Sequence, residues 1–141
     1  ENAEFAALVL LVQHWDSIAE WLIEGLFDED ANRMAFLALA DAGDLNGALE
    51  LAPPDAREVL ERAAVADLEL DATVEAQSLI AAATRRELRH RTAYTDPVSL
   101  EEDRAARLDL MALAESDPAR ALSAAESLLG WLHRRTEERA D

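Results

Sequence analysis

The chain has 141 residues, of which 30 are acidic and 13 are arginine, with three histidines, no lysine, no cysteine and a formal net charge of −17. This length fits one domain with its own core, and the lack of cysteine excludes a disulfide framework and thiolate chemistry. The acidity also disfavours direct binding to nucleic acid or to anionic lipid, because both carry negative charge.

The chain carries no segment that predicts membrane insertion. Its longest apolar run, residues 5–12, is too short to span a bilayer. No basic segment precedes this run, as one would in a signal peptide. We therefore expect no membrane partner, and the absence of cysteine fits a reducing cytoplasm, where we expect the domain to be located.

The first half of the chain predicts a bundle of five helices. Residues 3–14 are apolar around most of the circumference, which is typical of a central helix. Ser17 and Glu20 fit a capping box at the start of the second helix. Trp15 and Trp21 are expected in the core. The remaining helices are expected at 31–42, with Gly43 after its end, at 45–51, with Asp44 as N-cap, and at 55–66, after the Pro53-Pro54 pair.

A long helix is expected next, over residues 71–95. The stretch contains no glycine or proline and is rich in strong helix formers, and Asp71 fits its N-cap. We expect it to link a helical bundle (1–85) through its own end (86–95) to a C-terminal hairpin (96–141).

Four arginines crowd the last part of this helix, at Arg85, Arg86, Arg89 and Arg91. Cations near a helix C-terminus compensate the helix dipole, so they can be solvated charges with partners one turn away. The alternative is a basic patch that meets the acidic surface of a partner protein.

Two helices joined by a tight turn are expected at the C-terminal end, over 97–115 and 118–139. The Asp96-Pro97 and Asp117-Pro118 pairs each place an N-cap before a proline at the first helical position. Leu108, Met111 and Ala112 offer the first of these helices an apolar face. The second has a sustained stripe at Ala121, Leu122, Ala125, Leu128, Leu129 and Leu132. No segment alternates as a strand would, so the predicted fold class is all-α.

No catalytic constellation stands out in the sequence. There is no glycine-rich phosphate loop and no nucleophile elbow. Glu87 and His90 match the Glu-x-x-His pair of di-iron bundles, but such sites need two pairs and two further glutamates. The pair also lies among arginines, which disfavour a bound cation, so we expect no metal, no cofactor and no catalytic residue.

Trp131 is the most informative side chain for function. It falls roughly 120° from the centre of the apolar stripe of its helix and shares a face with Arg120 and Arg135. Tryptophan and arginine are over-represented at interface hot spots, so this face is a candidate docking surface. The alternative is that Trp131 packs on the preceding helix inside a wider hairpin seam.

The order of these apolar patterns resembles the C-terminal domain of DnaG-type bacterial DNA primases. In that family a leucine-rich first helix precedes a short helix, an acidic segment with phenylalanine and an alanine-rich helix. The segments that carry the resemblance are 9–15, 18–22, 26–27, 34–40 with Gly43, the long-helix segment 82–88 and the terminal hairpin. The resemblance covers nearly the whole chain.

The resemblance implies a protein-interaction domain rather than an enzyme, the polymerase parts of a primase lying in other segments. Its partner would be the N-terminal domain of the hexameric replicative helicase DnaB. The implied mechanism is burial of Leu128, Trp131 and Leu132 in a groove of the helicase, with Arg134 and Arg135 as rim contacts. Arg120 is a further candidate for partner binding. Alternatives are the fold-related N-terminal domain of the helicase itself, another all-α adaptor, or an enzyme or metal carrier built on a bundle.

Overall fold

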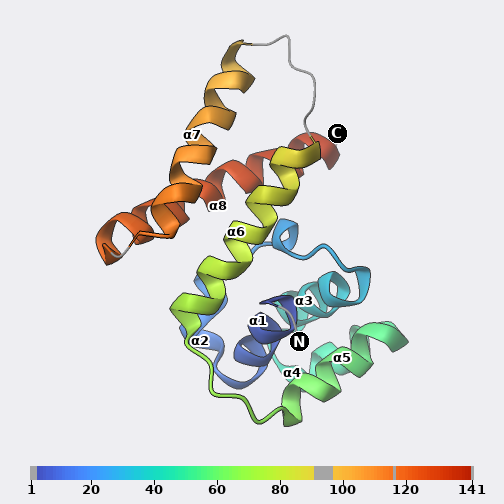
Figure 1. Ribbon diagram of the computed structural model, residues 1–141. Helices are drawn as coiled ribbons and strands as arrows, with labels where there is room; N and C mark the ends of the chain where they lie inside the picture. Colours follow the sequence, from blue (N-terminus) through green and yellow to red (C-terminus); the bar gives the residue numbers. More distant parts are fainter. Residues whose placement is uncertain (1–2, 91–96, 116, 141) are drawn as a thin grey trace. The chain divides into compact units, whose positions relative to one another are not determined.

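The computed structural model describes residues 3–90, 97–115 and 117–140, and these residues contain helices and no strand (Figure 1). The predicted all-α fold class is confirmed. The helices are α1 (Ala3–Gln13), α2 (Trp15–Ile18), the 3-10 turns η1 (Ala19–Trp21) and η2 (Glu24–Leu26), α3 (Asp30–Ala42), α4 (Leu45–Leu51), α5 (Pro54–Val65), α6 (Ala72–His90), α7 (Pro97–Leu113) and α8 (Pro118–Ala140).

The chain divides into two compact units, Glu1–Leu79 and Ile80–Asp141, with the boundary inside α6. The predicted division at residues 85 and 95 stays a prediction, and residues 91–96 lie outside the described part of the chain. The two units differ in charge. The first carries 18 acidic side chains and 3 arginines, a formal −15, whereas the second carries 12 and 10, a formal −2.

The core of the first unit is built around α1. Seven consecutive residues of this helix, from Phe5 to Leu11, are buried, and α1 packs against α2, α3 and α5. The predicted central position of the first helix is therefore confirmed. Leu26 and Leu60 are fully buried in the same unit, and Phe27 stacks on Phe36 with ring centroids 5.0 Å apart.

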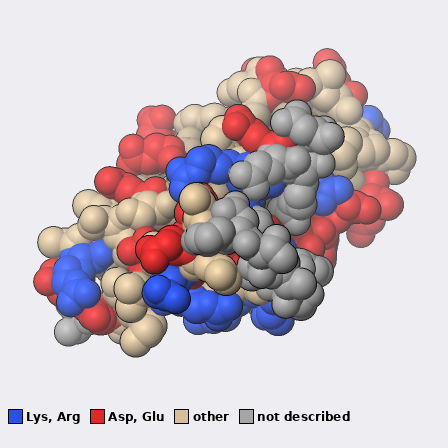
Figure 2. Space-filling model, turned by 90° about the horizontal axis from the view of Figure 1, so that it is seen from above, with Lys and Arg blue, Asp and Glu red and all other residues tan. Residues whose placement is uncertain are grey.

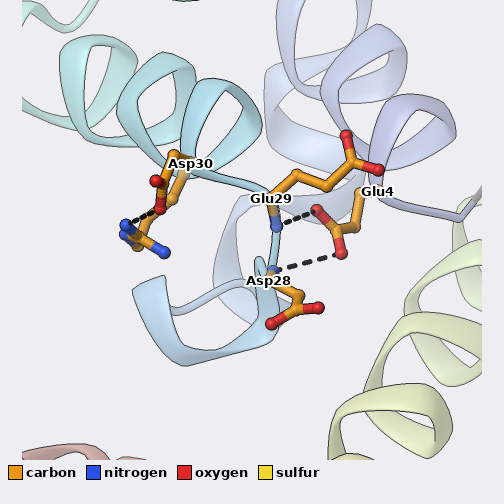
Figure 3. Close-up of polar contacts among 5 residues, drawn as sticks. Glu4, Asp28, Glu29 and Asp30 are labelled. Atoms are coloured by element: carbon orange, nitrogen blue, oxygen red, sulfur yellow. Dashed lines mark hydrogen bonds and ion pairs between the residues drawn. The ribbon is translucent and has the colours of Figure 1, made fainter.

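Two polar side chains at the ends of α1 satisfy the backbone of neighbouring segments. Glu4 accepts hydrogen bonds from the backbone N–H of Asp28 at 3.1 Å and of Glu29 at 3.3 Å (Figure 3). At the other end, the side-chain amide of Gln13 donates to the carbonyls of Ala63 and Ala66, both at 2.9 Å. Glu4 thus satisfies the backbone N–H groups of the two residues directly before α3, which have no partner within the helix.

The turn between α3 and α4 follows the predicted end signals. Gly43 has φ +79°, the left-handed conformation that glycine adopts at low cost, and its N–H bonds to the carbonyl of Leu39. Asp44 caps α4 by accepting from the backbone N–H of Gly47 at 2.7 Å. A Cβ at Gly47 would lie 2.9 Å from the Cβ of Ala42, so the close approach of the two helices also requires glycine there.

The segment after α1 differs from the expectation. Ser17 lies inside α2, where its hydroxyl donates to the carbonyl of His14 at 2.7 Å, so the predicted capping box with Glu20 is not formed. The predicted core position of Trp15 is also wrong, because this side chain is 39% exposed. Trp21 is half-buried.

The start of α6 depends on one carboxylate. Asp71 accepts from the backbone N–H of Thr73 at 2.9 Å and of Val74 at 3.2 Å, which confirms the predicted N-cap.

We expect Asp71→Ala to lower the free energy of unfolding by about 1 kcal/mol, measured by urea titration followed by circular dichroism. Asp67→Ala, an exposed position before the helix, is the control and should change it by less than about 0.5 kcal/mol. Equal effects of the two would contradict the capping role.

The second unit contains a hairpin of two helices, α7 and α8, which pack on each other. Asp117 caps α8 by accepting from the backbone N–H of Ala119 at 3.0 Å, as predicted. The Asp96 cap that was predicted for α7 lies outside the described residues. The hairpin core combines small side chains with three large ones, and its buried apolar members include Ala106, Ala112, Ala121, Ala124, Ala125, Leu128, Trp131 and Leu132.

Candidate interaction surfaces

A buried charged cluster lies in the seam between α7 and α8. The guanidinium of Arg135 donates to the carboxylate of Asp103 at 2.8 Å, and these side chains are only 3% and 5% exposed. The central carbon of the Arg135 guanidinium, Cζ, lies 5.2 Å from the centroid of the Trp131 ring, which is a cation–π contact. One oxygen of Asp103 and the indole nitrogen of Trp131 are buried without a hydrogen-bond partner among the described residues. The seam therefore depends strongly on the single Arg135 bond.

Most of the predicted helicase contacts lie inside this seam. Leu128, Trp131, Leu132 and Arg135 are buried, Trp131 being 4% exposed. Arg120 and Arg134 are exposed on α8, and Arg120 pairs with Glu115 at 2.9 Å. The structure thus gives Trp131 a position within the hairpin core, one of the two alternatives that the sequence left open. Direct contact of the four buried residues with a partner stays a prediction that would require the seam to open.

The apolar face predicted for α7 is wrong in part. Ala112 is buried, but Leu108 and Met111 are among the most exposed large apolar side chains of the described residues. The residue that α7 turns inward instead is Asp103, with Ala106 one turn later. On α8, Leu122 is also exposed although it was assigned to the inward stripe. Three large apolar side chains are thus exposed on the two helices of one hairpin.

The predicted basic patch near the end of α6 is partly described. Arg85 and Arg89 are exposed and Arg86 is half-buried, whereas Arg91 lies outside the described residues. A cavity of about 290 Å³ in the second unit brings Arg85, Leu88 and Arg89 of α6 together with Arg107 and Leu110 of α7. The sequence did not single out Arg107, since its place in this cavity depends on the packing of α7. On the face seen in Figure 2, basic side chains gather in patches between acidic and uncharged ones.

The predicted absence of a metal and of catalytic residues stays a prediction. No group of three histidine, cysteine, aspartate or glutamate side chains among them could hold a metal ion. Glu87 of the Glu-x-x-His pair is buried, and the His90 side chain lies outside what is described. Partial burial raises the pKa of Asp109 on α7 above its ordinary value. Among the described residues, no helix combines the length and hydrophobicity that crossing a membrane requires.

Comparison of the chain with known protein families, with curated proteins and with solved structures finds no match.

Proposed function

We propose that this chain is a non-catalytic, cytoplasmic protein-interaction domain of a bacterial primase, and that its partner is the N-terminal domain of the replicative DnaB-type helicase. The sequence resemblance to the C-terminal domain of DnaG-type primases names this partner. The all-α architecture, with a bundle and a terminal helical hairpin, is compatible with that proposal.

The observation that carries an interaction function is the exposed apolar surface of the hairpin. Met111 is 67% exposed, and Leu108 one turn before it and Leu122 on α8 are exposed as well. Leaving three large apolar side chains in water on one helical hairpin is unfavourable, and burying each against a partner would stabilise a complex by about 1.5–3 kcal/mol before the entropy of association is subtracted. These three residues, which we call the hairpin patch, are therefore our proposed helicase contacts, with exposed Arg120 and Arg134 on the same hairpin.

The proposal assigns the buried seam a different role from that of the hairpin patch. Leu128, Trp131 and Arg135 hold α7 and α8 together, and this packing presents the patch. A change in the seam therefore acts on helicase binding through the fold of the hairpin, whereas a change in the patch acts on binding directly.

The test is calorimetric titration of the domain into the isolated N-terminal domain of its own organism's helicase, at two salt concentrations. We expect saturable binding, and we expect Met111→Glu to weaken it by at least about tenfold, because a carboxylate would have to be buried. The matched control is Leu51→Glu, a position of similar exposure, 61%, on α4 in the first unit. This control should leave both the affinity and the unfolding midpoint unchanged.

Two results would count against this function. Absence of binding by the folded domain would remove the helicase as partner and leave the adaptor alternatives. Binding that is unaffected by Met111→Glu but lost in Leu51→Glu would move the contact surface to the first unit.

The salt dependence separates apolar from charged contacts. A weak effect of salt would place most of the affinity in apolar contacts rather than in Arg120 and Arg134.

A further inference from the structure

The cavity between α6 and α7 has an unusual set of lining residues. Three of its five lining side chains are arginines, Arg85, Arg89 and Arg107, and the other two are Leu88 and Leu110. We call it the arginine pocket. Its residues all belong to the second unit, so the pocket is defined within one compact part of the chain.

The three guanidinium groups are uncompensated within the described part of the chain. Arg85, Arg89 and Arg107 form no ion pair with any described residue. By contrast, Arg104 pairs with Glu101, Arg120 pairs with Glu115 and Arg135 pairs with Asp103. The three arginines converge on this cavity without a carboxylate among its lining residues. Like charges repel, so an anion bound between them would stabilise the arrangement.

The local charge permits an anionic ligand to approach. The first unit has a formal charge of −15, but the unit that holds the pocket has only −2, since it contains 10 of the 13 arginines. Arginine also suits this role because its planar fork can bind a carboxylate or a phosphate with two parallel hydrogen bonds.

We propose that the arginine pocket binds a segment of a protein partner in which carboxylate side chains stand next to an apolar side chain. The carboxylates would bind the three guanidinium groups, and the apolar side chain would contact buried Leu88 and half-buried Leu110. A nucleic acid is disfavoured because its affinity comes from many phosphates along an extended basic surface, whereas this basic surface is a single cavity of about 290 Å³ on an acidic protein. The pocket and the hairpin patch share no residue, and the pocket proposal does not depend on the helicase proposal.

The experiment uses the whole domain and a fluorescent peptide that alternates glutamate with leucine, with binding followed by anisotropy. We expect saturable binding that weakens as salt is raised. A peptide with glutamine in place of glutamate and a peptide with serine in place of leucine should each bind at least about tenfold more weakly, since each removes one half of the recognition.

Matched arginine variants locate the binding site. Arg107→Gln and Arg85→Gln should each weaken binding of the glutamate–leucine peptide by about tenfold, because each removes one charge-assisted contact. Arg104→Gln is the control, since this largely exposed arginine lies on α7 outside the pocket, and it should change the affinity by less than about twofold. All three positions are exposed, so the variants are expected to keep the native unfolding midpoint.

Three outcomes would overturn the proposal: no saturable binding of the peptide, equal effects of Arg107→Gln and Arg104→Gln, or tighter binding of a single-stranded oligothymidylate than of the peptide. The last result would assign the pocket to nucleic acid. The Arg85→Gln variant should still bind the helicase domain in the calorimetric titration, because Arg85 lies on α6 rather than on the hairpin. A failure of the pocket proposal and a failure of the helicase proposal therefore give different results.

Discussion

Replacing Arg135 with methionine is expected to lower the free energy of unfolding by about 3–5 kcal/mol, measured by urea titration. The substitution keeps an unbranched side chain in the seam but removes the only hydrogen-bond partner that the structure shows for the Asp103 carboxylate, a group that is 5% exposed. A buried carboxylate without a partner is far less stable than one in water, so the variant leaves an uncompensated charge in the hairpin. It also removes the cation above the Trp131 ring.

The neighbouring position provides the control for this prediction. Arg134 lies on the exposed side of the same helix, so Arg134→Met should change stability by less than about 0.5 kcal/mol. The double variant Asp103→Leu with Arg135→Met should recover most of the loss, since removing both charges leaves no group that needs compensation. If the double variant is as unstable as Arg135→Met alone, the ion pair is not the cause of the loss.

Replacing Trp131 with alanine is expected to lower the free energy of unfolding by a similar amount, about 3–5 kcal/mol. The indole is 4% exposed, so its removal leaves a cavity in the seam and uncovers the guanidinium of Arg135. Trp15→Ala is the matched control, because Trp15 is 39% exposed and its loss should destabilise the chain by less than about 1 kcal/mol. Comparable losses for the two tryptophans would contradict the assignment of Trp131 to the hairpin core.

This expectation changes how helicase binding by Trp131→Ala is to be interpreted. From the sequence alone, a loss of binding with intact helicity would point to a direct contact. With Trp131 in the seam, a loss of binding follows from a loosened hairpin, and circular dichroism in the far ultraviolet is insensitive to loosened packing. The urea midpoint of the variant, compared with that of Met111→Glu, separates the two causes, because a loosened hairpin lowers the midpoint whereas loss of a direct contact does not.

The sequence predicts the helices of this fold well because their ends depend on local chemistry. Asp44, Asp71 and Asp117 each cap the helix for which they were identified, and Gly43 adopts the left-handed conformation expected after α3. Each of these signals acts within four residues along the chain, so no tertiary information is needed to read it.

The orientation of α7 could not be predicted in the same way, because neighbouring helices decide which face is buried. The helix has two competing faces, one with Leu108 and Met111 and one with Asp103 and Ala106. The first is more apolar, yet the second is buried, since Asp103 meets Arg135 across 32 residues of chain. A lone carboxylate is unfavourable in a core, and only its partner on α8 makes the burial of Asp103 tolerable.

The candidate sites were predictable only in part for the same reason. Arg85 and Arg89 were recognised as members of a basic patch because they are close in sequence. Arg107 joins them through the packing of α7. From the sequence, the apolar residues Leu128, Trp131 and Leu132 fit either a docking surface or the seam between the two helices. In the structure Trp131 belongs to the seam, where it lies beside Arg135 and its partner Asp103.

The polar ends of α1 have a consequence for the uniqueness of the fold. A helix that is apolar on every side can be turned about its axis or shifted by one turn and still bury nearly the same area. Hydrophobic burial therefore places the helix inside the core but does not determine its register against its neighbours. Glu4 and Gln13 remove this degeneracy, because they lie about 13 Å apart along the helix and each can reach its backbone partners in only one register. The apolar residues of α1 thus supply most of its stability, whereas two hydrogen-bonding side chains decide which of several similar packings is the native one.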